Sequence, residues 1–207
     1  MSYIPKDAVT QSFKSNKGVL TPNQIIKLDN ENKFTKFGQL EHLQTQTISS
    51  SVADFTQLQE SVYDVHLFTF TDIHFSSQTE FDYRLSDDGG TTFETGYSFA
   101  NNRITSDGGI SERKTTSQLS ARLFGDIDNG ANSAGSGYMY LYNAGNFRYT
   151  FSLSHFTFMN NDDKYACEYG SQAYNHTESI SAIRFGQGNS MDSLTSATIS
   201  VYGIRSF

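Results

Sequence analysis

Hydrophobic and polar residues alternate with a period of two along most of the chain beyond residue 40. Residues 81–99, FDYRLSDDGGTTFETGYSF, show this best, with apolar side chains at alternate positions on both sides of an Asp-Asp-Gly-Gly sequence. Successive side chains of a β-strand point to opposite faces, so each half would carry one aromatic face. Asp and Gly adopt the positive φ angles of tight turns, and we therefore predict a β-hairpin here.

A hairpin is only marginally stable alone, so other strands must cover its aromatic face. Residues 61–75 are apolar on both faces, which is typical of a central strand or of a strand at a subunit interface. Weaker strand patterns occupy residues 43–55, 117–124, 138–142, 146–158, 164–168, 179–185 and 196–204, and residues 101–114 and 125–137 have the composition of connections. Eight to ten short strands without a convincing helix predict an all-β fold, namely a two-sheet antiparallel β-sandwich of jelly-roll or lectin-like type.

Residues 1–40 differ from the rest because they show no sustained period, and Pro5 and Pro22 interrupt them. We predict an extended N-terminal arm over residues 1–40, followed by a single β-sandwich head domain over residues 41–207. The arm is too short to bury its own apolar residues, so we expect it to anchor the head to another subunit or protein. The side chains expected to make this anchor are Lys14, Lys17, Ile25, Ile26 and Leu28.

Charge is divided unevenly between the two parts. The chain carries −7 in total, and residues 1–40 hold six lysines and three acidic residues, a net +3, which leaves −10 for the head. An acidic head argues against nucleic acid as a partner, because phosphates need a basic surface. The basic arm either docks on an acidic partner surface or forms a solvated tail.

Cysteine content and hydropathy narrow the class of protein further. Cys167 is the single cysteine, so it forms no internal disulfide, and we expect a small buried residue rather than a nucleophile. The sequence contains no run of eighteen apolar residues, and its N-terminus lacks the apolar segment of a secretory signal. We therefore expect neither membrane insertion nor export.

Few residues suggest a metal site. Asp126 and Asp128 place carboxylate oxygens at alternate positions of a predicted loop, as Ca²⁺ prefers, although Asp-Asn-Gly is also the sequence of an ordinary tight turn. His66 and His74 fall in or beside a strand, where we expect hydrogen-bonded histidines rather than metal ligands. Apart from possible Ca²⁺ at Asp126 and Asp128, we expect no cofactor.

Catalytic patterns are weak. Glu80, Asp82 and Glu94 could pair as the carboxylates of a glycosidase, but acidic β proteins commonly offer such pairs. Ser136 lies in a Gly-Ser-Gly sequence that lacks the remainder of a nucleophile elbow. We therefore expect no catalytic residues and no enzyme activity.

Aromatic residues outside the predicted strands point to binding instead. Tyr169 and Tyr174 lie in residues 165–176, which we interpret as largely a loop, where their rings could stack on sugars or enter a protein interface. The alternative is that the aromatic residues simply fill the sandwich.

Four segments resemble a module of virion proteins from tailed bacteriophages, particularly marine ones. They are TQTISSSVADFTQL, YDVHLFTFTDI, FDYRLSDDGGTTFETGYSFA and SAIRFGQGNSMDSLTSATISVYGI, and together the resemblance covers residues 45–207. The module occurs in structural, tail-fibre and decoration proteins. The resemblance implies a lectin-like or jelly-roll sandwich displayed on a virus particle, and it carries over no catalytic residue.

Three functions follow as expectations. The first is a structural virion protein, assembled in the host cytoplasm, whose arm docks on capsid or tail proteins and whose head forms a homotrimer, because doubly apolar strands suit subunit packing. The second is an adhesin that recognises a host-surface glycan. The third, from the enzyme class, is a capsule depolymerase.

Overall fold

The computed structural model describes residues 21–30 and 40–204, and every structural statement below refers to them. The chain divides into two units, residues 1–37 and residues 38–207. The described part of the first unit is one helix, α1 (Pro22–Asn30). No described helix has both the length and the apolar character needed to cross a membrane.

Helix α1 corrects the prediction of an extended arm for residues 22–30. The Thr21 hydroxyl accepts a hydrogen bond from the Gln24 amide at 3.4 Å, and the Gln24 side-chain oxygen accepts one from the Thr21 amide at 2.8 Å. This reciprocal pair is a capping box, which satisfies two backbone donors at a helix N-terminus. Pro22 occupies the first helical position, where its missing N–H costs nothing. The proline therefore starts a helix rather than interrupting the chain.

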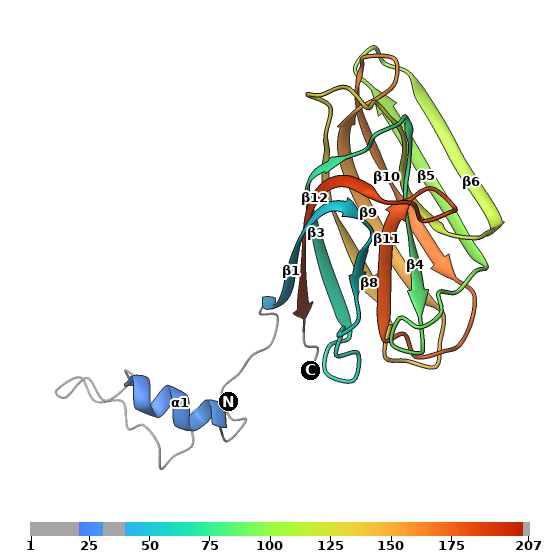
Figure 1. Ribbon diagram of the computed structural model, residues 1–207. Coiled ribbons are helices and arrows are strands. Elements are labelled where there is room, and N and C mark those ends of the chain that lie inside the picture. Colours follow the sequence, from blue (N-terminus) through green and yellow to red (C-terminus); the bar gives the residue numbers. More distant parts are fainter. Residues whose placement is uncertain (1–20, 31–39, 205–207) are drawn as a thin grey trace. The chain divides into compact units, whose positions relative to one another are not determined.

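The second unit consists of two antiparallel sheets (Figure 1). The larger contains, in spatial order, β1 (Leu40–Ser51), β12 (Leu194–Ile204), β3 (Val65–His74), β8 (Gly135–Tyr142), β9 (Thr150–Met159), β10 (Tyr165–Tyr174), β5 (Tyr97–Thr105) and β6 (Ile110–Gln118). The smaller contains β2 (Ala53–Phe55), β11 (Ala182–Gln187), β4 (Thr79–Ser86) and β7 (Ala121–Ile127). This arrangement confirms the predicted all-β sandwich. Strand β3 pairs with β12 and β8, so residues 61–75 do contain a central strand.

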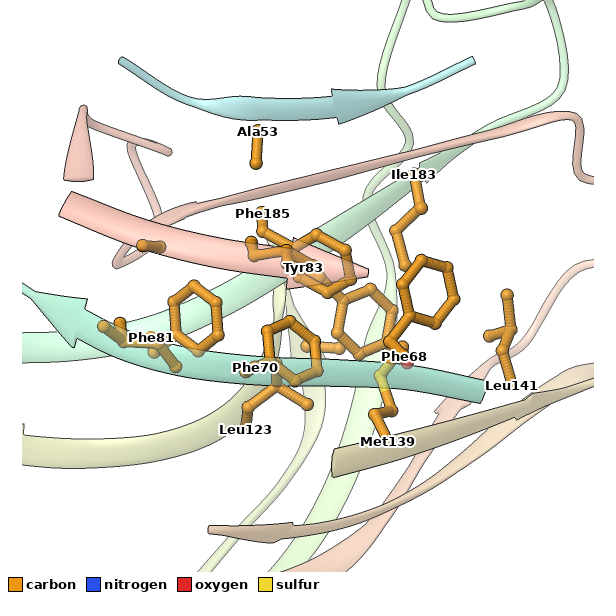
Figure 2. Close-up of a cluster of buried hydrophobic side chains, with 14 of the residues drawn as sticks. Ala53, Phe68, Phe70, Phe81, Tyr83, Leu123, Met139, Leu141, Ile183 and Phe185 are labelled. Carbon is orange, nitrogen blue, oxygen red and sulfur yellow. The ribbon is translucent and has the colours of Figure 1, made fainter. Parts of the chain in front are cut away.

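Aromatic rings from both sheets interlock in the core (Figure 2). The ring of Phe70 in β3 lies 5.6 Å from that of Phe81 in β4, 5.0 Å from that of Phe185 in β11 and 5.2 Å from that of Phe156 in β9. The first two contacts are edge-to-face, the geometry that the ring quadrupole favours. All four side chains are buried, so they hold the two sheets together.

The predicted hairpin over residues 81–99 is wrong, because β4 and β5 belong to different sheets. The Asp88 carboxylate accepts hydrogen bonds from the Thr91 and Thr92 amides at 3.0 and 2.9 Å, which shapes the connection as a loop that crosses between sheets. The two aromatic sets nevertheless face one core, since the rings of Tyr83 and Tyr97 lie 5.9 Å apart. The alternating pattern thus predicted correctly which side chains face the core, but it predicted the wrong partner strand for β4.

A hairpin does form where a connection was predicted, in residues 101–114. Strands β5 and β6 pair around a turn in which Gly108 has a φ of +86°. The Gly108 amide donates to the Thr105 carbonyl at 2.9 Å, and the Thr105 amide donates to the Gly109 carbonyl at 2.9 Å. Strand β6 was not predicted because its sequence is polar. The polar sequence fits its place as an edge strand of the larger sheet, with much of its length exposed to solvent.

We expect the Phe81→Ala substitution to lower the free energy of unfolding by about 3–5 kcal/mol, because it leaves a cavity between five aromatic rings. Chemical denaturation measures this loss. Phe151→Ala is the matched control, since the Phe151 side chain is 45% exposed and its truncation should cost under about 1 kcal/mol. Equal losses in the two variants would contradict the described core.

Candidate binding face

The first part of strand β9, residues 151–154, has its apolar and polar faces inverted. The side chains of Ser152 and Ser154 are 0% and 5% exposed. Those of Phe151 and Leu153, which alternate with them, are 45% and 50% exposed. The usual arrangement buries the aromatic and aliphatic set and leaves serines to water. Exposed apolar side chains that collect on one face mark an interaction site more often than a solvated surface.

The inversion continues into the next two strands of the sheet, β10 and β5. Glu168 and Gln172 of β10 and Asn101 of β5 are buried, while Tyr169 of β10 is 43% exposed on the opposite face. The register pairs Tyr169 with His155 of β9. Three adjacent strands therefore turn polar side chains inward and part of their apolar surface outward.

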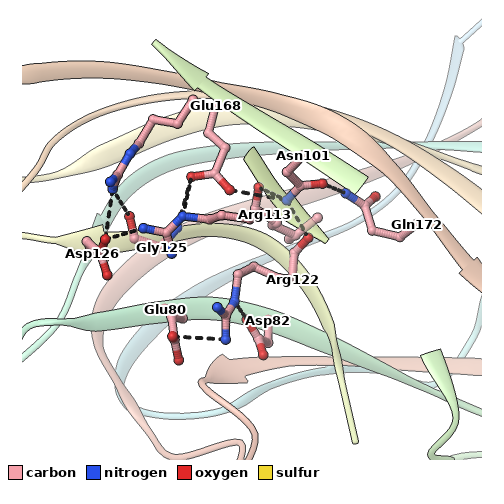
Figure 3. A network of polar contacts seen from close by, with 11 residues as sticks. Glu80, Asp82, Asn101, Arg113, Arg122, Gly125, Asp126, Glu168 and Gln172 are labelled. Atoms are coloured by element: carbon pink, nitrogen blue, oxygen red, sulfur yellow. Dashed lines mark hydrogen bonds and ion pairs between the residues drawn. The ribbon is translucent and has the colours of Figure 1, made fainter. Parts of the chain in front are cut away.

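A hydrogen-bonded layer inside the sandwich accommodates these buried polar groups (Figure 3). The Gln172 amide nitrogen donates to the Asn101 side-chain oxygen at 3.1 Å and to the Ser154 hydroxyl at 3.0 Å. The Asn101 amide nitrogen donates to a Glu168 carboxylate oxygen at 3.2 Å. The Ser152 hydroxyl donates to the Gln172 carbonyl oxygen. Because these groups satisfy one another, their burial avoids the large cost of an unpaired polar atom.

Two arginines balance the acidic charge at the end of this layer (Figure 3). Arg103 lies 3.0 Å from Asp126, Arg113 also pairs with Asp126, and Arg113 Nε lies 4.0 Å from Glu168. Burial raises the pKa of the Glu168 carboxyl, and the Arg113 charge opposes this only in part. Burial would also raise the pKa of Asp126, but Arg113 and Arg103 together lower it. This cluster fixes β5, β6, β7 and β10 against one another.

The structure does not bring Asp126 and Asp128 together as calcium ligands. Asp126 lies in β7 rather than in a loop and faces the two arginines. Asp128 accepts hydrogen bonds from the Ser133 hydroxyl and from the Gly130 amide at 3.0 Å, which lower its pKa and form the tight turn that was the alternative.

Another group of carboxylates does have metal-ligand spacing. Among the described residues, the acidic side chains whose oxygen atoms lie within 4.8 Å of one another are Asp87, Glu94 and Glu178. Partial burial and the charges of Asp87 and Glu178 raise the pKa of Glu94. This cluster was not predicted from the sequence, because Glu178 is distant along the chain from the other two residues.

The structure separates Tyr169 from Tyr174 and places both in β10 rather than in a loop. Tyr174 is 1% exposed, and its hydroxyl donates to Glu178 at 2.8 Å, so this ring belongs to the core. Tyr169 remains available on the outer face. Because the two residues lie an odd number of positions apart in one strand, they point to opposite sides of the sheet.

The outer face of the larger sheet is hollowed over β5, β6, β8, β9 and β10. Two open hollows of about 960 Å³ and about 580 Å³ share Ala100, Tyr142, Leu153 and Ser171, so they form one groove, which we call the aromatic groove. The described residues lining it that have side chains on the outer face include Ser98, Ala100, Asn102, Lys114, Thr116, Tyr138, Tyr140, Tyr142, Phe151, Leu153, His155, Tyr169, Ser171 and Ala173. The groove exists because small side chains occupy the middle strands and larger ones flank them.

Tyrosine and histidine rings form one wall of the aromatic groove. Tyr138 and Tyr140 have ring centroids 5.9 Å apart, and the His155 ring lies 5.8 Å from that of Tyr138 and 6.3 Å from that of Tyr169. His155 Nε2 lies 3.0 Å from the Cys167 sulfur. Burial raises the pKa of Cys167, which keeps it a thiol and works against a role as nucleophile.

The carboxylates considered for glycoside hydrolysis lie elsewhere. Glu80 and Asp82 belong to β4 of the smaller sheet and pair with Arg122 at 2.9 and 3.5 Å (Figure 3). Burial raises the pKa of Asp82, and Arg122 and the Ser120 hydroxyl oppose this. Two histidines are likewise structural, since His66 Nε2 donates to the Leu58 carbonyl at 2.6 Å and His74 Nδ1 to the Ser133 carbonyl at 2.7 Å.

The residues proposed as an anchor are described in part. Ile25 and Ile26 lie on α1 with side chains 37% and 57% exposed, and Leu28 on the same helix is half-buried. Lys14 and Lys17 lie outside the described residues. The anchoring role of all five stays a prediction.

Comparison with known protein sequences identifies no relative of this chain. The chain matches no protein-family model and no curated protein sequence.

We expect Glu168→Gln to change how stability depends on pH. The folded pKa of Glu168 is raised from 4.5, so its contribution to stability is complete below that value and is lost as pH rises through the folded pKa. A glutamine does not titrate, so the stability of the variant relative to wild type should increase as the pH rises above 4.5 and through the folded pKa of Glu168. Urea denaturation across this range measures the difference.

Glu112→Gln on β6 is the matched control, because that side chain is 68% exposed and should show a much smaller change with pH. A Glu168→Gln difference that stays constant with pH would contradict a desolvated Glu168 carboxyl.

Proposed function

We propose that this chain is a non-enzymatic virion protein of a tailed bacteriophage whose β-sandwich head binds a host-surface glycan through the aromatic groove. The virion setting is supported by the resemblance over residues 45–207. Glycan binding is supported by one observation above all, namely that Phe151 and Leu153 face solvent while Ser152 and Ser154 are buried.

The groove has the chemistry that sugar recognition requires. Apolar walls at Tyr142, Phe151 and Leu153 can pack against the C–H faces of sugar rings, while Asn102 and Ser171 can exchange hydrogen bonds with hydroxyl groups. The expected site thus moves from the loops to the face of the larger sheet. Tyr169 keeps its proposed ligand-binding role there, and Tyr174 does not.

A depolymerase has weaker support. Glycoside hydrolysis generally requires two carboxylates on opposite sides of the scissile bond. None of the described residues lining the groove is acidic, and Glu80 and Asp82 pair with Arg122 on the other sheet.

A structural role with the face packed against neighbouring copies is the second candidate. Beyond the groove, Ile104, Ile110 and Tyr165 are 41%, 74% and 73% exposed at one end of the same face. A homotrimer would bury these side chains, as the doubly apolar strands first suggested. This arrangement competes with glycan binding only if the contact also covers Phe151.

A glycan array probed with the full chain tests the proposed binding. We expect Phe151→Ala and Tyr169→Ala to weaken binding about tenfold each, because losing one ring contact worth about 1.4 kcal/mol reduces affinity by that factor. Tyr165→Ala is the matched control, since Tyr165 shares the strand and face of Tyr169 but does not line the groove.

Equal losses in all three variants would show that binding does not use the groove. A chain that binds no glycan and is a trimer in solution, with Phe151→Ala dissociating it, would support the structural role instead.

The arm is tested separately by removing residues 1–37, the first unit of the chain. The head keeps its own core, so the truncated protein should retain its thermal unfolding transition. We expect its incorporation into phage particles to fall to background when it replaces the full chain in an infection. Incorporation at the full-length level, measured by quantitative mass spectrometry of purified particles, would contradict the anchoring role.

A further inference from the structure

We infer that the aromatic groove takes an uncharged, extended oligosaccharide that runs along β5 and β10, parallel to these strands. This inference rests on the proposed function, and it specifies the class and the orientation of the ligand. Three features of the outer face carry it: the alignment of the residues on the groove floor, the side chains on both sides of them, and the charge of the lining.

The floor of the groove is a row of small side chains along two neighbouring strands. Ser98 of β5 pairs with Ala173 of β10, and Ala100 of β5 pairs with Ser171 of β10. From Ser98 to Asn102 the row covers four residue steps of about 3.4 Å each, which give about 14 Å. A floor of this length accommodates more than one linked sugar ring, and a single ring would fill only part of it.

Larger side chains rise on one side of this row. Phe151 and Leu153 of β9 pair with Ala173 and Ser171 of β10. Tyr142 and Tyr140 of β8 pair with Phe151 and Leu153 and continue the apolar surface.

Strand β6 forms the other side. Lys114 pairs with Ala100, and Thr116 lies two residues further along β6. The low row at Ser98, Ala100, Ser171 and Ala173 therefore forms a trough whose long axis follows β5 and β10.

The lining is close to electrically neutral. None of its described residues is acidic, and Lys114 supplies its formal cation, with the ammonium nitrogen 3.0 Å from the Glu112 carboxylate. The chain as a whole carries a net charge of −7, which repels an anionic polymer. The groove offers such a polymer only Lys114 as a formal cation among its described residues, and Lys114 is paired with Glu112. Hydroxyl and amide groups at Ser171 and Asn102 suit the hydroxyls of neutral sugars.

Binding of the full chain to immobilised polysaccharides tests the charge class. The probes are neutral glucan, mannan and galactan, compared with anionic alginate, hyaluronate and polysialic acid. We expect retention on at least one neutral polymer that exceeds retention on every anionic one by at least tenfold. Preference for an anionic polymer would overturn this inference and leave the proposed function standing, whereas retention on none would overturn both.

Competition with oligosaccharides of the retained polymer tests the orientation and length. We expect the inhibiting concentration to fall at least tenfold from the monosaccharide to chains that fill the row, and then to level off. A monosaccharide that competes as well as the longer chains would overturn the extended ligand while leaving glycan binding intact.

A substitution that fills the trough supplies a second test. Ser171→Phe should abolish binding of the longer chains, because its ring would occupy the middle of the floor. Thr157→Phe is the matched control, since Thr157 is exposed on the same face but does not line the groove. Both variants should retain the wild-type circular dichroism spectrum, and equal binding by two folded variants would contradict the proposed path.

Discussion

The face on which each side chain of a strand lies is fixed by its parity, and the whole account depends on how β9 and β10 use this constraint. A strand that turns polar residues inward must turn their neighbours outward. Ser152 and Gln172 can face the interior because the hydrogen-bonded layer around Asn101 and Glu168 satisfies them. The exposed apolar face that includes Phe151 is the other consequence of the same parity. The buried polar hydrogen bonds and the exposed aromatic surface thus both follow from the alternation of side chains along the same strands.

One region of the sandwich supplies most of the apolar core, and another presents the proposed binding surface. Around β3, β4 and β11, rings such as Phe70 and Phe185 pack in the usual way and hold the sheets together (Figure 2). Around β7, which packs on β9, β10 and β5, hydrogen bonds and the Arg113 cluster add to the contacts of the Phe124 ring with Phe156 and Phe158 (Figure 3). Because the ring-packed region supplies a large apolar core, the strands above the polar region can present tyrosine and phenylalanine to solvent.

Much of the fold could be predicted from alternation alone, since aromatic residues at every second position indicate strands with one buried face. Pairing could not be predicted, because the hydrogen bonds of Asp88 direct its loop between sheets, and a turn-rich sequence alone also fits a hairpin. Helix α1 was overlooked although Thr21 and Gln24 carry its start signal. For the site, Tyr169 was predicted as a binding residue, but its position in a strand on the outer face of the larger sheet was not predicted. Which parity of β9 faces the core depends on partners such as Gln172, which are distant in sequence.

The outward position of Phe151 is the most direct test of this account. The chain contains no tryptophan, so Phe151→Trp and Phe158→Trp each introduce a single fluorophore on β9, at positions that are 45% and 3% exposed in the parent. Acrylamide quenching of the free protein should be strong for the first variant and weak for the second, and a bound neutral polysaccharide should protect only the first. Equal protection of both tryptophans in the free protein would contradict the inverted face.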